Sequence, residues 1–527
     1  MKKVFLLFIL FASVPAFSQS PYWQQDLRYT IKASLNDADK TIQGEETIVY
    51  KNNSPSSLDF IWFHIWPNAY KNENTTLIKQ IKGDSSRSKK MENFGTGYID
   101  ELAFTVNGKP AKTEPHPNPQ YIDIIKVLLG KPLAPGDSVT IATPFKVQLP
   151  PYFSRSGYAD GEFMACQWYP KPAVFDKDGW HEMPYLDMGE FYSEYATYAV
   201  SITLPADYVV GATGNLLTKD ELDAYKRIGA MNAKERKGKP ELYKPAAGAT
   251  TKTLQYYAEK VPDFAWFAEK GFVIQYDTAQ LPTGKVVDAF TYYHNKKGTI
   301  WSNSIDYVKD GLRKYSEWIG EYGYPVAQAV EGPANNSSGG MEYPMITLIT
   351  SPDAKKETLD AVIVHEVGHN WFMAMLGSNE RMHTWMDEGL NSYFQFRYEA
   401  EKYRSNSVFG DAIPAEIKKL PADDFLATVY NVIDKSLPMQ YPMDTPADKF
   451  PNSDEYGLVS YVKTALWMYL LEASSGREKA DKAIQLYFSK WKFKHPQPAD
   501  MKAAFEEAVG GNLDKFFEMT KKEGKLE

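Results

Sequence analysis

The chain has 527 residues, of which 43% are hydrophobic and 24% are charged, and its formal net charge is −8. This length is too great for one hydrophobic core and predicts two or more domains, while the composition is typical of a globular protein. The acidic balance, with no long basic run, excludes nucleic acid as an expected partner.

Residues 1–18 have the pattern of a secretory signal peptide. Lys2 and Lys3 precede an apolar stretch that is too short to span a bilayer, and small residues lie near Ser18. No later segment has the roughly 18 uninterrupted apolar residues of a membrane span, so we expect no stable membrane insertion after signal cleavage. Cys166 is the only cysteine, which excludes an intrachain disulfide. Together these features predict a periplasmic or secreted protein.

Residues 19–278 are expected to form an N-terminal β-sandwich domain. The runs "DLRYTIKASL" and "KTIQGEETIVY" flank a polar turn at residues 36–39, which predicts a hairpin. Further β-branched runs between turn residues are "VTIATPFKVQL", "YAVSITL" and "YVVGATG". The polar, lysine-rich segment 218–253 is predicted to be a surface insertion between strands, because charge runs are usually solvated.

Residues 279–527 change to helices with short strands between them. The segment "NSIDYVKDGLRKYSEWIGEYG" has helical spacing, and "AQAVEGPANNSSGGMEYPMITLI" predicts a strand, a loop and a strand. The helix in "LDAVIVHEVGHNWFMAML" is expected to end at Gly377. From Glu455 onward, four helical patterns are separated by "SSG", "HPQP" and "GGN". The fold class predicted is therefore multidomain α+β, with a β-rich front half and a helical back half.

The sequence His365-Glu366-Val367-Gly368-His369 is an H-E-x-x-H motif. Residues four apart share one helix face, so the two histidines can bind one metal ion. Glu366 leaves the helix at another angle, where it can take a proton from a metal-activated water. Eighteen residues separate His369 from Glu388, and a second helix packed on the first can return that carboxylate as third ligand. Two imidazoles and one carboxylate favour a single Zn²⁺ ion.

These motifs, with "GGMEYP" upstream and "SYVKTAL" downstream, resemble the aminopeptidase N and leukotriene A hydrolase family of gluzincin zinc peptidases. The resemblance covers most of the chain after residue 18. It implies a β-sandwich "saddle" domain followed by a thermolysin-like, mostly helical zinc peptidase domain. It also implies peptide substrates and one catalytic zinc.

In that family a G-x-M-E-N loop lies along the substrate, and its glutamate binds the free α-amine. The matching residues here are Gly339, Gly340, Met341 and Glu342, while Tyr343 replaces the asparagine. A carboxylate at Glu342 would pair with an ammonium group and so select N-termini. An alternative for Glu342 is an exposed acid at a loop tip.

The resemblance implies three further roles. A tyrosine that stabilises the oxyanion matches Tyr461, with Tyr456 as the competing candidate. A Gln or Glu that the β domain brings to the amine site matches Gln167. A residue that supports a zinc histidine matches Gln395, where the family has glutamate.

The sequence thus predicts an exported zinc aminopeptidase. Only 66 residues follow Tyr461, so the long helical domain that caps the cleft in most family members is expected to be absent. Together with Tyr343, this keeps a zinc endopeptidase or oligopeptidase with an open cleft as the first alternative. A non-catalytic binding protein on the same fold is the second alternative.

Overall fold

The structure is a computed structural model that describes residues 22–334, 339–351 and 354–526. The predicted signal peptide, residues 1–18, lies outside the described residues. None of the helices in the described ranges is long and apolar enough to cross a membrane.

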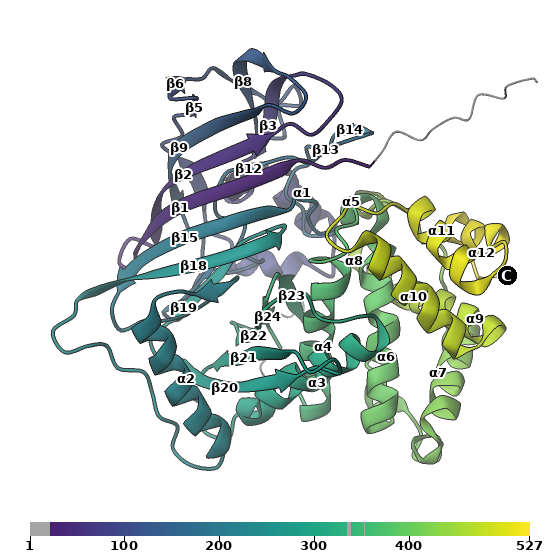
Figure 1. The fold of residues 1–527 in the computed structure, drawn as a ribbon. Coiled ribbons are helices and arrows are strands. Elements are labelled where there is room, and N and C mark those ends of the chain that lie inside the picture. The colour runs from purple at the N-terminus through teal and green to yellow at the C-terminus, as the bar shows by residue number, and fades with distance from the viewer. Residues whose placement is uncertain (1–21, 335–338, 352–353, 527) are drawn as a thin grey trace, which may run out of the picture.

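Three main sheets form the N-terminal part of the chain (Figure 1). The largest has the order β17-β18-β15-β1-β2-β9-β5-β6, with β4 also paired to β9. Its strands are β1 (Asp26–Asn36), β2 (Thr41–Lys51), β4 (Tyr98–Asp100), β5 (Thr105–Val106), β6 (Lys109–Pro110), β9 (Ser138–Gln148), β15 (Ala196–Pro205), β17 (Asn215–Leu216) and β18 (Thr251–Val261). The second sheet contains β3 (Leu58–His64), β7 (Thr113–Pro115), β8 (Ile124–Leu133) and β12 (Lys171–Pro172). The third contains β10 (Gly157–Ala159), β11 (Glu162–Ala165), β16 (Val209–Ala212) and β19 (Trp266–Glu269).

The predicted hairpin at residues 36–39 is confirmed. Strands β1 and β2 pair antiparallel from Asp26 opposite Lys51 to Asn36 opposite Thr41. Side chains along β1 alternate strictly between exposed and buried, so one face of this strand packs into the core and the other faces solvent. A short ribbon of β13 (Phe175–Asp176) and β14 (Gly179–Trp180) and the helix α1 (Thr76–Gly83) complete this part.

A five-stranded sheet begins the second part of the chain, in the order β20-β21-β22-β24-β23. Its strands are β20 (Val273–Gln280), β21 (Val286–Tyr293), β22 (Val326–Glu331), β23 (Gly340–Tyr343) and β24 (Ile346–Ile349). The predicted domain boundary at 278/279 therefore falls inside β20, and the change of sheet comes earlier, between β19 and β20. The predicted insertion 218–253 contains helix α2 (Lys219–Lys234), which packs on β20.

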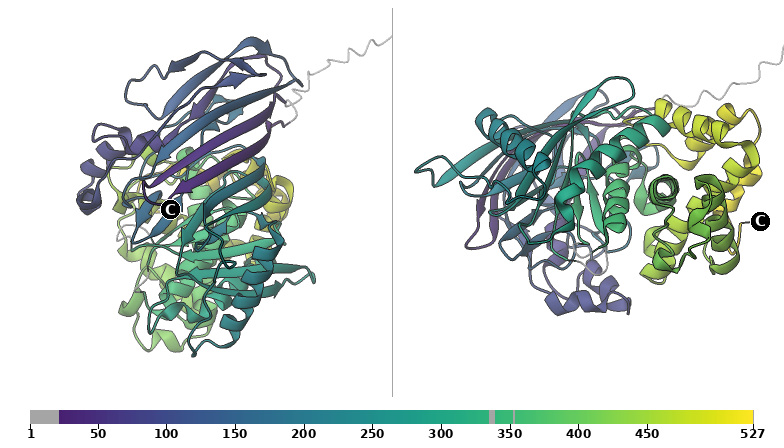
Figure 2. Two further views of the ribbon diagram at one scale, coloured as in Figure 1. Left: turned by 90° about the vertical axis from the view of Figure 1, so that its left-hand side faces the viewer. Right: turned by 90° about the horizontal axis from the view of Figure 1, so that it is seen from below.

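Helices cover the five-stranded sheet and form the C-terminal part, as Figures 1 and 2 show. They are α3 (Ser304–Trp318), α4 (Lys356–Phe372), α5 (Glu380–His383), α6 (Glu388–Tyr403), α7 (Ala422–Ser436), α8 (Ser453–Gly457), α9 (Thr464–Ser475), α10 (Arg477–Trp491), α11 (Pro498–Val509) and α12 (Asp514–Glu518). Helix α4 packs on β23, β24, α3 and α6, and both α4 and α6 are buried on nearly all sides. Polar side chains on such central helices must be paired or functional.

Helix α4 ends at Phe372 with Met373 as its C-cap, so the cap predicted at Gly377 is wrong by four residues. After Met373 the chain leaves the helix in turns, and Leu376 forms a bridge to Lys494. The backbone N–H of Gly377 then donates to the carbonyl oxygen of Lys494 at 3.0 Å. This contact with a segment far along the chain replaces the local helix cap that the glycine suggested.

The two parts of the chain are tied by a buried ionic contact. His294, which follows β21, has its Nε2 3.0 Å from Glu162 on β11, and its backbone N–H donates to Glu331 on β22 at 2.9 Å. The hydrogen bonds and charges of the two glutamates outweigh burial and raise the pKa of His294 to about 10. The contact fixes the start of the loop that leads from β22 to β23.

Candidate metal centre and active-site cleft

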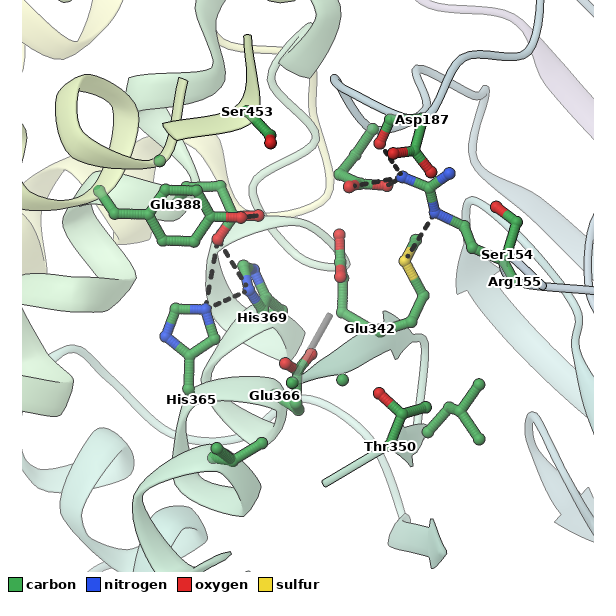
Figure 3. Close-up of a pocket in the computed structure, with 18 of the residues that line it drawn as sticks. Ser154, Arg155, Asp187, Glu342, Thr350, His365, Glu366, His369, Glu388 and Ser453 are labelled. Atoms are coloured by element: carbon green, nitrogen blue, oxygen red, sulfur yellow. Dashed lines mark hydrogen bonds and ion pairs between the residues drawn. The ribbon is translucent and has the colours of Figure 1, made fainter. Parts of the chain in front are cut away.

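Two helices bring the predicted metal ligands together (Figure 3). His365 and His369 project from one face of α4, and Glu388 is the first residue of α6. The Nε2 atoms of the two histidines lie 3.1 Å apart, and each lies 3.3 Å from Oε2 of Glu388. Tetrahedral zinc with bonds of about 2.0–2.2 Å holds its ligand atoms about 3.3–3.5 Å apart. The triad therefore fits one zinc ion.

Asp387 fixes the tautomer of His369. Its Oδ1 lies 2.7 Å from Nδ1 of His369, so the imidazole proton belongs on Nδ1 and the Nε2 lone pair faces Glu388. Lone pairs and a carboxylate oxygen that converge in a buried site repel each other unless a cation lies between them. This arrangement supports metal binding independently of the distances.

Gln395 does not provide the support predicted for it. Its amide nitrogen donates to Glu399 at 2.6 Å and to Ser407 at 3.0 Å. Nδ1 of His365 is buried without a hydrogen-bond partner among the described residues. The acid that supports a zinc histidine is instead Asp387, whose carboxylate is bonded to His369 and which the sequence analysis missed although it directly precedes Glu388.

Glu366 lies beside the triad and lines the same cleft. Burial raises the pKa of Glu366 to about 8, and the positive charge of a bound zinc would act in the opposite direction. Gly340 makes room for this side chain, because a Cβ at Gly340 would lie 2.5 Å from Oε1 of Glu366. Gly340, which is predicted to lie close to the substrate, therefore also leaves the space that the side chain of Glu366 occupies.

Tyr461 contacts the metal centre from a π-helical turn, Leu458–Lys463. Its hydroxyl donates to Oε1 of Glu388 at 2.5 Å, and its ring stacks on His365 at 6.0 Å between centroids. Burial and the charge of Glu388 raise the pKa of Tyr461 well above its ordinary value, so the hydroxyl stays protonated and can donate. The hydroxyl of Tyr456 also lies at the cleft but has no partner among the described residues.

The cleft has a volume of about 340 Å³, and one of its walls is strand β23. Gly339, Gly340, Met341 and Glu342 all line it, as predicted from the G-x-M-E pattern. The side chain of Glu342 is buried, which removes the alternative of an exposed acid at a loop tip.

Gln167 is not among the described residues that line this cleft. Its backbone has a φ of 47°, and its side chain is bonded to Asp263 at 3.3 Å and to the hydroxyl of Tyr343 at 3.2 Å. These bonds hold it against a smaller neighbouring cavity. The β domain contributes two carboxylates to the cleft, Asp187 and Glu190, and the charge of Glu190 acts on Glu342 and on Glu388.

Arg155, also missed by the sequence analysis, holds Glu190 in place. Its guanidinium donates to both carboxylate oxygens of Glu190 at 2.8 Å and to Sδ of Met341 at 3.1 Å. It therefore links the β domain to the strand that carries Glu342. Neither residue lies in a local motif, so only the folded structure reveals them.

Comparison with known proteins gives a consistent result. A model of the peptidase family M1 domain matches residues 306–520. A protein named leucine aminopeptidase 2 from Neurospora crassa is 23% identical over 458 residues, which cover 82% of this chain and 59% of that protein. A protein of the same name from Chaetomium globosum is 22% identical, with 82% and 64% covered. The chain thus spans about 60% of the length of these two relatives.

Solved structures share the fold. An M1 zinc metallopeptidase mutant from Deinococcus radiodurans, bound to a Tyr-Ser-Ala substrate, has a TM-score of 0.63 at 14% identity, and the match covers 95% of each chain. Legionella pneumophila aminopeptidase A, in complex with aspartic acid, has a TM-score of 0.64 at 13% identity and covers 96% of this chain and 50% of that one. Residues 306–520 therefore match the peptidase family M1 domain, and the chain has the fold of the M1 zinc metallopeptidases.

Proposed function

We propose that this chain is a zinc-dependent aminopeptidase that removes N-terminal residues from peptides. The observation that supports this most is the convergence of three ligand atoms at 3.1–3.3 Å, with Glu366 and Glu342 lining the same cleft. The Deinococcus relative bound to Tyr-Ser-Ala supports a peptide as the substrate.

Each residue of the metal centre has its own role in the proposed hydrolysis. When bound by His365, His369 and Glu388, zinc lowers the pKa of a coordinated water and polarises the scissile carbonyl. Glu366 accepts the proton of the attacking water on its carboxylate and delivers it to the nitrogen of the leaving amine. The hydroxyl of Tyr461 donates a hydrogen bond to the carbonyl oxygen as negative charge develops there.

Glu342 and Glu190 are the groups that select a free N-terminus. An α-ammonium group carries three N–H donors and one positive charge, and these two buried carboxylates offer acceptors of opposite charge. Arg155 is bonded to Glu190, whereas burial and the neighbouring carboxylates raise the pKa of Glu342, and the positive charge of a bound ammonium group would favour its carboxylate form. A peptide segment without a free amine would leave Glu342 desolvated and unpaired, which is unfavourable.

A comparison of free and N-acetylated aminoacyl substrates tests this function. The zinc-loaded enzyme is expected to hydrolyse the free amine and to lose at least about 100-fold in kcat/KM on the acetylated substrate, and a chelator should abolish both rates. Glu342→Gln should lower kcat/KM on the free amine by about 10- to 100-fold, because a charge-assisted hydrogen bond is lost.

Each alternative has its own outcome in the same assay. Equal hydrolysis of the two substrates would identify an endopeptidase or oligopeptidase. Bound zinc without hydrolysis of either substrate would identify a binding protein. As a control, Glu357→Gln removes an exposed acid from the same helix as the zinc histidines and should leave all rates unchanged.

We also propose that the protein is exported, periplasmic or secreted, on the pattern of residues 1–18. Expression in a bacterial host should yield a mature chain that begins at Gln19, because cleavage is expected after Ser18. N-terminal sequencing of the envelope and medium fractions checks this. Recovery of the uncleaved chain from the cytoplasmic fraction alone would contradict it.

A further inference from the structure

A second, smaller cavity of about 30 Å³ lies against strand β23. Met341 and Glu342 are the only described residues that line both this cavity and the cleft. Ser378 and Glu380 line only the smaller cavity. Its volume exceeds the roughly 10–15 Å³ that one water-sized particle needs. The wall between the two spaces is therefore formed in part by the side chain that we assign to amine binding.

Three buried carboxylates converge at the edge of this cavity: Glu342 and Glu380 line it, and Asp387 lies next to them although it is not one of the lining residues. One oxygen of each lies within 4.8 Å of the others. The three residues are 5%, 1% and 0% exposed, and one oxygen of each has no hydrogen-bond partner among the described residues. Buried charges are normally paired or bound to a cation, so these three carboxylates lack a partner for their remaining oxygens.

Ser378 is an independent sign of a bound ligand. It is 2% exposed, it lines the same cavity as Glu380, and its Oγ has no partner within the described part of the chain. A hydroxyl oxygen, like a carboxylate, offers lone pairs to a cation. Glu342 from β23 and three side chains from residues 378–387 thus each leave a polar atom without a partner among the described residues.

The two nearby arginines donate to other groups, and only Nε of Arg381 among their hydrogen-bonding atoms has no partner among the described residues. Arg155 is bonded to Glu190, and Arg381 donates to the backbone carbonyls of Pro184 and Gly189. Even with zinc in place, more carboxylates than positive charges surround the centre. The carboxylates concerned are Glu190, Glu342, Glu366, Glu380, Asp387 and Glu388. This shortage of positive charge requires either protons bound to the carboxylates or a further cation.

We propose that Glu342, Glu380, Asp387 and Ser378 bind a Ca²⁺ ion at the edge of the smaller cavity, where the three carboxylates meet. A set made only of oxygen atoms favours a hard cation over zinc. Mg²⁺ usually keeps several of its waters, for which this cavity has no room, whereas Ca²⁺ accepts six to eight oxygen ligands at flexible angles. Glu342 and Glu380 binding through both oxygens, Asp387 binding through Oδ2 and one hydroxyl would supply up to six, because Oδ1 of Asp387 is bonded to His369.

The role of this ion rests on the proposed function of the cleft. An ion behind Glu342 fixes the carboxylate that receives the substrate's α-ammonium group, so it positions the amine anchor without touching the reacting atoms. Loss of the ion is therefore expected to raise KM for free-amine substrates about tenfold and to leave kcat nearly unchanged, since Glu366 and Tyr461 are not involved.

The test uses the full chain loaded with zinc and freed of calcium on a chelating resin, with its zinc content verified. Radioactive calcium binding and thermal unfolding are measured during titration with CaCl₂, and MgCl₂ serves as comparison. We expect one Ca²⁺ per chain and a rise in Tm of about 2–4 °C, because a ligand stabilises the state that binds it. Mg²⁺ should give no rise.

Two variants and one control locate the site. Glu380→Gln should lose calcium binding, and Ser378→Ala should weaken it about tenfold, which keeps the test valid if the first variant does not fold. Glu357→Gln should bind calcium as the wild type does. No calcium binding by the zinc-loaded wild type, or unchanged binding in both variants, would overturn the proposal and indicate that protons neutralise the cluster. Calcium binding that depends on Glu380 in a protein without aminopeptidase activity would support the site and reject the proposed function.

Discussion

Replacing Glu366 with glutamine is expected to lower kcat by about 10²–10⁴-fold, the range in which a positioned general base contributes, while the zinc stays bound. Glutamine keeps the size and the hydrogen-bonding outline of the side chain but cannot accept the proton of the attacking water. Glu366 is not a member of the triad whose ligand atoms lie 3.1–3.3 Å apart, so the metal should remain.

The measurement combines steady-state kinetics with zinc analysis of the same preparation. KM should change little, because Glu342 and Glu190 still receive the amine. Glu357→Gln, on an exposed position of the same helix, controls for the loss of one negative charge near α4. Turnover at the wild-type rate in a Glu366→Gln variant with full zinc would remove Glu366 from the mechanism.

The metal centre could be predicted from the sequence because local geometry determines most of it. Four residues advance an α-helix by little more than one turn, which places His365 and His369 on one face wherever the helix lies. Glu388 is harder to predict as a ligand, because its carboxylate reaches the two histidines only if α6 packs against α4. Glu388 could still be assigned because the eighteen residues that separate it from His369 are a signal in themselves, which helix periodicity does not provide.

The missed residues depend on contacts that no local pattern encodes. Glu190 and Arg155 lie on loops of the β domain, and they reach the cleft only because that domain packs against β23. Gln167 has a side chain of the expected type in the expected region, but its bonds to Asp263 and Tyr343 direct it to the other cavity. The fold class was predictable from periodicity, whereas the assignment of single polar side chains to a cleft was not.

The backbone conformation around Tyr461 also could not be predicted from a local sequence pattern. Residues Leu458–Lys463 form a π-helical turn, a rare conformation that is frequent at functional sites and has no clear sequence signal. Gly389 allows α6 to approach this turn, because a Cβ there would lie 2.6 Å from the backbone oxygen of Ser460. The close approach brings the hydroxyl of Tyr461 to Glu388 at the metal centre.

Tyr461→Phe is expected to lower kcat by about 10²–10³-fold, the effect of removing one donor that stabilises an oxyanion. The substitution removes a single oxygen atom and keeps the ring that stacks on His365. Because the raised pKa of Tyr461 keeps the hydroxyl protonated, the wild-type donor should not titrate in the neutral range, and the ratio of the two rates should stay constant from about pH 6 to pH 9.

Tyr456→Phe is the matched control, since it removes the same atom from a buried tyrosine whose ring centroid lies 6.1 Å from that of Tyr461. The hydroxyl of Tyr456 has no partner among the described residues, so its loss should change kcat less than about threefold and should not destabilise the fold. If Tyr456→Phe lost turnover and Tyr461→Phe did not, the oxyanion donor would be Tyr456. If neither variant lost turnover, the zinc ion alone would have to stabilise the developing charge, and the contact between Tyr461 and Glu388 would be structural.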